Sequence, residues 1–267
     1  MNGVLLVQTW RWQAVKLAIV ALCAVGWGWL LPLFYAQFSD SIRTLAAQNP
    51  LFQQLSNFGS GSLLTLPGTV TLGTEHPIAI ALLGVFAVGM GAVAVAGERQ
   101  RGTLEVLLAR PIPRRGLVMT LTVALLGLIA VVIAAMLAGM TLGAATQGIF
   151  DQLNVSRLPL VWVNGFLLWS AFGTFAIAAS VSFDRSGPAI GLSLAYLMVN
   201  YFLEILGTFV PGARWAQEYS LFHHFQPTEI LTGSADPLDF VLLLAVAVIP
   251  LVYALVVFPR RDLPAPG

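Results

Sequence analysis

The sequence predicts an all-α membrane protein with six transmembrane helices, and three observations support that fold class. Hydrophobic residues make up 58% of the 267 residues and charged residues only 9%, whereas a soluble domain carries roughly 25% charged residues because its surface faces water. The mean hydropathy is +0.85. Six apolar segments are long enough to cross the hydrocarbon core of roughly 30 Å. We therefore expect a single transmembrane domain over residues 1–267.

The first expected span is longer than the apolar part of a cleavable signal peptide, and no small-x-small site closes it, so we interpret it as a retained helix. Pro188 lies in the first turn of the fifth span, where a proline removes no helical hydrogen bond. Pro211 and Gly212 follow that span and end it. The six spans are expected at residues 16–38, 77–96, 117–145, 160–181, 188–209 and 240–258.

Residues 7–16 precede the first span and read VQTWRWQAVK. Trp10 and Trp12, interleaved with Arg11 and Lys16, are typical of a short helix in the headgroup layer, where indole rings and basic groups are both favoured. The same residues also suit a simple anchor flanking the first span, and the sequence supports both interpretations equally.

Basic residues predict the orientation. With the amino terminus in the cytoplasm, three basic residues (Arg43, Arg157 and Arg214) fall on the outer side and the other ten of the 13 on the cytoplasmic side, in agreement with the positive-inside rule. An even number of spans then returns the carboxyl terminus to the cytoplasm. The ten are Arg11, Lys16, Arg99, Arg101, Arg110, Arg114, Arg115, Arg185, Arg260 and Arg261.

Residues 97–115, between the second and third spans, read GERQRGTLEVLLARPIPRR and differ sharply in composition from the apolar segments around them. Leu104, Leu107 and Leu108 share one face of a short helix, because they lie three and four residues apart. Thr103 is placed to cap that helix, and two prolines follow it. We expect an amphipathic helix whose leucine face either binds a soluble partner or lies on anionic lipid.

This segment resembles the signature loop of type-2 ABC transporter permeases, E-x-x-x-GTLE-x-LLA-x-P-x-x-R, over residues 98–114. The resemblance implies the six-span type-2 exporter fold, in which this loop is the coupling helix that docks on a separate ATPase subunit. It also implies a homodimer of permeases with two ATPase subunits, located in a prokaryotic plasma membrane. The residues expected to carry the coupling are Glu98, Arg101, Gly102, Thr103, Leu104, Glu105, Leu107, Leu108, Arg110 and Pro111.

The family further implies a segment between the fifth and sixth spans that re-enters the membrane from outside. Residues 211–238 fit that description, because two short apolar-aromatic stretches are interrupted there by Gly, Pro and polar residues. Trp215 and Tyr219 are aromatic side chains of the kind found at membrane interfaces. We expect two short helices that dip into the outer leaflet.

The chain is not expected to be an enzyme or to hold a cofactor. A P-loop needs G-x-x-x-x-G-K-[ST], and the chain's one lysine, Lys16, lies between Val15 and Leu17. ATP and Mg²⁺ are therefore expected in the partner ATPase. The chain has a single cysteine, Cys23, which excludes a cysteine cluster, and the adjacent His223 and His224 do not form a shared metal site. The net charge of +1 gives no reason to expect nucleic acid as a partner.

Two alternatives to an ATP-driven exporter remain: an ion-coupled secondary transporter and a membrane-embedded lipid-modifying enzyme. Glu204 lies within the fifth span, beside Tyr201 and on one helical face with Asn200. A buried carboxylate there either lines the translocation path or dimer interface, or reaches the outer headgroups. Aromatic and aliphatic surfaces with few buried charges favour an amphipathic cargo, namely a drug, a peptide or a lipid, without identifying it.

Overall fold

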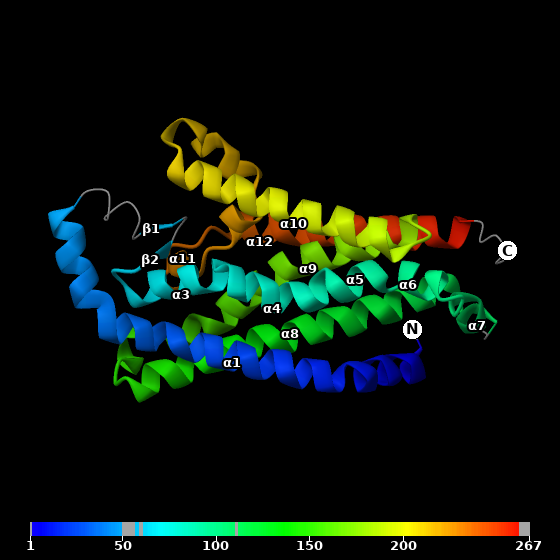
Figure 1. Cartoon of the computed structure of the whole chain (residues 1–267), viewed down its shortest axis with the longest axis horizontal. Helices are drawn as coiled ribbons and strands as arrows, with labels where there is room; N and C mark the ends of the chain where they lie inside the picture. The colour runs from blue at the N-terminus through cyan, green and yellow to red at the C-terminus, as the bar shows by residue number, and fades with distance from the viewer. Residues whose placement is uncertain (1, 50–56, 59–60, 110–111, 262–267) are drawn as a thin grey trace.

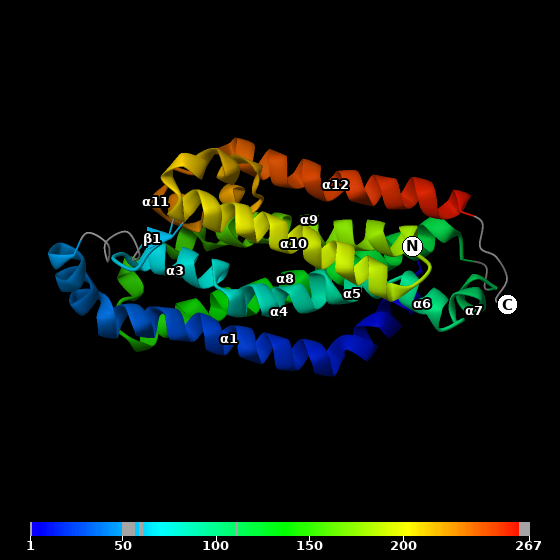
Figure 2. The same cartoon turned by 45° about the horizontal axis from the view of Figure 1, so that its top comes forward.

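The computed structural model describes residues 2–49, 57–58, 61–109 and 112–261, and nearly all of them are helical (Figure 1). Five helices are long and apolar enough to cross a membrane, and one bent pair of helices makes a sixth candidate span. The spans lie side by side in one elongated bundle, as Figures 1 and 2 show. The predicted all-α fold with up to six spans is confirmed.

The first helix, α1 (Gly3–Gln48), runs without a break for 46 residues. At 1.5 Å per residue it is about 69 Å long, roughly twice the thickness of the hydrocarbon core. The short helix expected at residues 7–16 and the span expected at 16–38 are both parts of it. They are continuous because neither Gly nor Pro separates Trp12 from the apolar run that follows.

The second span is broken, which the sequence did not predict. It consists of α3 (Leu66–Glu75), α4 (Pro77–Ala87) and α5 (Gly89–Val93), and its two halves are bent by 50°. The expected start at Pro77 is the bend itself, where the ring nitrogen of His76 accepts a hydrogen bond from the backbone N–H of Ile78. The half formed by α3 escaped prediction because its sequence, LPGTVTLGTE, is too polar to be recognised as a span.

The other four spans begin and end within three residues of the predicted positions. The bounds of these four spans were predicted accurately because each span is one continuous apolar run. The observed helices are α8 (Arg114–Thr146), α9 (Leu158–Ser182), α10 (Ser186–Phe209) and α12 (Pro237–Arg260).

The core of the bundle forms around α9, which packs against α5, α8, α10 and α12. Its Trp169 and Phe172 are almost completely buried. On the far side of α8, glycines allow α1 to approach closely, since a methyl group at Gly139 or Gly143 would collide with main-chain atoms of α1. Close backbone approach through small residues is how helices gain packing energy in lipid.

Short elements gather at one end of the bundle, which we call the α11 end. Residues 211–238 hold three short helical pieces rather than the two expected. Connections and a small antiparallel hairpin lie at the same end (Figure 1). These elements are β1 (Asn57–Phe58), β2 (Gly61–Ser62), the 3₁₀ helices η1 (Phe150–Gln152), η2 (Val155–Arg157), η3 (Pro211–Tyr219) and η4 (Phe222–His224), and the helix α11 (Pro227–Thr232).

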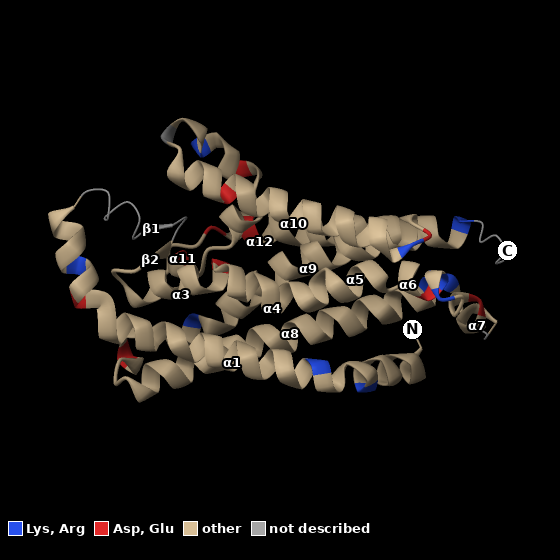
Figure 3. Ribbon diagram, viewed as in Figure 1, with Lys and Arg blue, Asp and Glu red and all other residues tan. Residues whose placement is uncertain are grey.

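The opposite end, which we call the α7 end, carries the two helices of the loop after the second span, α6 (Ala96–Gln100) and α7 (Leu104–Leu108). α1 begins there and α12 ends there (Figure 1). Several basic residues lie at this end, whereas the α11 end carries several of the acidic ones (Figure 3). Both ends of the described chain therefore lie on the side where the basic residues cluster.

Candidate functional site

The loop between the second and third spans is a compact turn of two short helices at the α7 end. α6 and α7 are joined through Arg101, Gly102 and Thr103. Gly102 has a φ of +70°, in the left-handed region that other residues rarely adopt, so the reversal of the chain depends on a glycine there. The loop is thereby fixed in shape at its tip.

Glu98 holds this turn together. Its Oε2 accepts a hydrogen bond from the Thr103 hydroxyl at 2.6 Å, and its Oε1 forms an ion pair with Arg101. The backbone N–H of Thr103 donates to the main-chain oxygen of Glu98 at 2.9 Å. Thr103 therefore does not cap α7 as expected, because its hydroxyl is bonded to Glu98 instead. Two further expected coupling residues, Arg110 and Pro111, lie outside the described residues.

The leucine face of α7 is turned toward the bundle, which corrects the expectation that it is exposed. Leu104 is only 3% exposed, and Leu108 is half-buried against the core. Leu107 and Leu104 line a pocket of about 560 Å³ together with Trp12 of α1. The side chains that face solvent are those of the opposite face, including Glu105 and Val106, the latter 64% exposed.

α6 is attached to the rest of the bundle on its other side. The helix is interrupted between α5 and α6, which leaves backbone N–H groups without their usual partners. The hydroxyl of Ser180, near the end of α9, accepts hydrogen bonds from the N–H groups of Val95 and Ala96. The side-chain oxygen of Gln100 accepts from both the backbone N–H and the hydroxyl of Ser186, the first residue of α10.

At the other end, the polar residues expected to line a path are buried under the segment 211–238. Asn200 and Glu204 are only 4% and 2% exposed. The side-chain oxygen of Asn200 accepts from the N–H of Leu221, and Oε1 of Glu204 accepts from the amide of Gln217 at 2.9 Å. Tyr201 meets the ring of Phe222 edge-on. In this conformation all three hold η3 and η4 against α10.

Sequence reasoning missed a second buried carboxylate. Glu75, the last residue of α3, is only 3% exposed. The predicted second span begins at Pro77, which leaves Glu75 outside every predicted helix. Glu75 is buried because the helix bends at His76. Trp27 of α1 packs against this bend: its ring centroid lies 4.8 Å from that of the imidazole, and its indole N–H donates to the main-chain oxygen of Gly73.

The two histidines of the segment 211–238, His223 and His224, have separate environments. Nδ1 of His224 lies 2.7 Å from Oδ1 of Asp239, whereas burial lowers the pKa of His223, with the neighbouring charge of His224 as a second cause. Their rings are 5.5 Å apart and steeply inclined. Within the described residues, no three His, Cys, Asp or Glu side chains are grouped to hold a metal ion.

The structure is thus a bundle of helices long and apolar enough to span a membrane, with a compact loop of two short helices after the second span. The family model of the ABC-2 family transporter proteins matches residues 9–263, and the chain belongs to that family. Such a protein is a transport permease and not itself a P-loop ATPase. No curated protein matches the chain at a significant level.

Proposed function

We propose that this chain is the permease of an ATP-driven exporter and that a separate ATPase subunit docks on the loop 97–115. The observation that supports this best is the construction of that loop. Glu98 and Gly102 fix its shape, and the side chains of Glu105 and Val106 on its outward face are exposed to solvent. A loop of fixed shape passes the displacement of a docked ATPase on to the membrane helices, because it does not itself deform.

The outward face of α7 is the proposed docking surface. It presents Thr103, Glu105, Val106 and Ala109 to solvent, a small apolar centre beside a carboxylate, of a size suited to a groove in a partner. Two permease copies, each with one ATPase that binds ATP and Mg²⁺, would complete the transporter. In this arrangement the α7 end faces the cytoplasm of a prokaryotic cell, because the basic residues gather there.

The cargo we propose is amphipathic: a drug, a peptide or a lipid. A pocket of about 540 Å³ between α1 and α3 supports this class. Its lining is almost entirely apolar and includes Leu31, Phe34 and Leu72, with His76 and Gln37 as polar groups. Apolar pockets with a few placed polar groups are typical of small-molecule sites. Asn200, Tyr201 and Glu204 would join the path when the outer segment moves away from α10.

Ion-coupled transport is the second candidate function, and the buried carboxylates of Glu75 and Glu204 favour it. Oε2 of each is buried without a hydrogen-bond partner among the described residues, and such groups inside membranes often mark ion pathways. The two functions differ in energy source. Transport into vesicles that continues after a protonophore or ionophore collapses the ion gradients, but stops without ATP, supports the exporter.

The docking claim is tested by changing the outward face alone. The double variant Glu105→Arg and Val106→Asp is expected to insert normally and to lose most co-purification with the ATPase. Val155→Asp introduces the same carboxylate at a partly exposed position at the α11 end and is expected to leave the complex intact. Undiminished co-purification of the double variant contradicts docking on this face. The pair Leu107→Asp and Leu108→Asp is less informative, because these leucines pack against the permease itself.

A further inference from the structure

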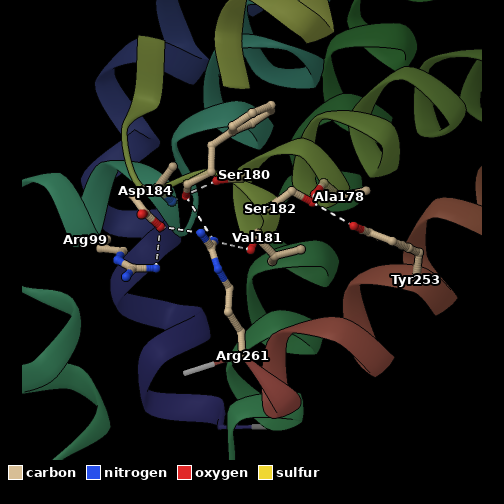
Figure 4. Close-up of polar contacts among 10 residues, drawn as sticks. Arg99, Ala178, Ser180, Val181, Ser182, Asp184, Tyr253 and Arg261 are labelled. Carbon is tan, nitrogen blue, oxygen red and sulfur yellow. Dashed lines mark hydrogen bonds and ion pairs between the residues drawn. The ribbon is translucent and has the colours of Figure 1, made fainter. Parts of the chain in front are cut away.

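Three segments that are far apart in the sequence meet on one carboxylate oxygen at the α7 end (Figure 4). Oδ1 of Asp184, in the connection between α9 and α10, lies 2.6 Å from Nη1 of Arg99 in α6. The same oxygen forms an ion pair with Arg261, the residue that follows α12. Asp184 therefore links the loop after the second span to the start of α10 and to the end of α12.

The two cations are more buried than the anion that they share. The side chains of Arg99 and Arg261 are 15% and 23% exposed, and that of Asp184 is 60% exposed. Guanidinium groups withdrawn from water need a compensating charge, and two of them close together repel each other. The charge of Asp184 is what allows both arginines to occupy this place at once.

Arg261 is held on a second side. Its Nη1 donates to the main-chain oxygens of Val181, at 2.6 Å, and Phe183, at 3.3 Å. These carbonyls lie at the carboxyl-terminal end of α9, where helical carbonyls lack partners and a basic side chain is favoured. The main-chain oxygen of Arg261 accepts from Arg114, the first residue of α8, at 2.7 Å. The end of α12 is thus tied to α8 and α9 as well as to Asp184.

We propose that Asp184 is a positioning residue of the transport cycle: by holding Arg99 and Arg261 on one oxygen, it makes α6, α10 and α12 move as one body when α7 is displaced. The chain has an obvious place to flex instead, the interruption between α5 and α6. Without the shared carboxylate, α6 stays joined to α10 through Gln100 and Ser186, but it loses its ion-pair link to the end of α12, so a push on α7 is taken up at that interruption and does not reach α12. This inference rests on the proposed docking of an ATPase at α7.

The first test needs the permease alone, in lipid nanodiscs. We expect Asp184→Asn to speed amide hydrogen exchange about ten-fold in two separate segments, residues 95–100 and 256–261, because both arginines lose their shared partner. Arg185→Gln is the matched control, since Arg185 is exposed and makes no ion pair within the described residues. Asp184→Glu keeps the charge and is expected to restore slow exchange. Faster exchange in only one segment, or in neither, overturns the proposal.

The second test uses the complete transporter with its ATPase. In a Cys23→Ser background, spin labels at Ile19→Cys in α1 and Ile249→Cys in α12, both exposed, report a distance across the bundle. ATP with vanadate is expected to change that distance in the parent protein. Asp184→Asn is expected to abolish the change while the complex still forms and hydrolyses ATP, a separation that general destabilisation does not produce. An unaltered distance change in Asp184→Asn overturns the proposal.

The two tests separate this proposal from the proposed function. If no ATPase associates with the parent protein and nucleotide leaves the distance unchanged, the proposed function fails, whatever hydrogen exchange shows. If Asp184→Asn folds poorly, Arg99→Gln breaks the same link from its other partner. That variant is expected to lose the nucleotide-driven change in the same way, and retention of the change there also overturns the proposal.

Discussion

Gly28 of α1 lies directly against the main-chain oxygen of Met136 in α8. No side chain fits between the two helices at this point, so α1 is seated on α8 by backbone contact. Gly26, two residues earlier in the same helix, faces open space. The close approach therefore depends on one side of α1 and not on a general need for glycine in that helix.

Gly28→Ala is expected to separate α1 from α8 and to destabilise the protein by about 1–3 kcal/mol, the usual effect of overfilling a packed contact. A lower midpoint of thermal unfolding in detergent measures it. Gly26→Ala adds the same methyl group where nothing lies within 4 Å, so its unfolding midpoint should match or slightly exceed that of the parent. Equal midpoints for the two variants contradict the packing argument.

Ser180→Ala is expected to destabilise the protein by about 1–3 kcal/mol, because it leaves the buried N–H groups of Val95 and Ala96 without an acceptor. Thermal unfolding measures the loss, and hydrogen exchange should locate it at the junction of α5 and α6. Ser182→Ala removes a half-buried hydroxyl two residues further along α9 and is expected to have a smaller effect. A larger loss of stability in Ser182→Ala than in Ser180→Ala contradicts the role given to Ser180.

His223 is expected to make the segment 211–238 less stable in acid. Burial lowers its pKa below the ordinary 6.5, so the unfolded chain binds more protons than the folded one as the pH falls through that value, and stability declines. Thermal unfolding between pH 7.5 and 5 measures the decline. His223→Gln keeps the pair of His224 and Asp239, and its unfolding midpoint should fall less steeply with decreasing pH. If the midpoints of the variant and the parent fall in parallel, His223 is not the group responsible.

Asn164→Ala is expected to loosen the α11 end by about 1–3 kcal/mol, because this buried side chain donates to the main-chain oxygen of His224 and accepts from the N–H of Gln226. Faster hydrogen exchange of residues 222–232 is the measurement. Tyr219→Ala, at a side chain 72% exposed in the same segment, should leave exchange there unchanged. Similar exchange in both variants contradicts the role given to Asn164.

The sequence was sufficient to predict the spans that are continuous apolar runs, and these account for most of the fold. It was not sufficient for α3, a helix stabilised by tertiary packing, because its two glycines and three threonines give no hydrophobic pattern. Nor did it reveal that Glu75 is buried, since burial there depends on the bend at His76. A hydrophobic pattern identifies a continuous apolar segment, and the polar half-span α3 has no such pattern.

The short helix of the loop between the second and third spans was predicted in position, but the direction of its leucine face was not. Helical periodicity shows that Leu104, Leu107 and Leu108 share a face, yet it does not show toward which side that face turns. The meeting of Arg99 and Arg261 on Asp184 has no sequence signal at all, because contacts over such separations arise only when the bundle closes.

The two faces of α7 have different neighbours, and this has a consequence for how the loop can change over generations. The side chains that seat the helix, such as Leu104, point inward, and those that meet solvent, such as Glu105 and Val106, contribute little to the packing of the bundle. Substitutions on the outer face are therefore nearly neutral for folding. With the ATPase docked on this face as proposed, a gene duplicate of this permease can diverge there and recognise a different partner without first acquiring compensating changes in its membrane helices.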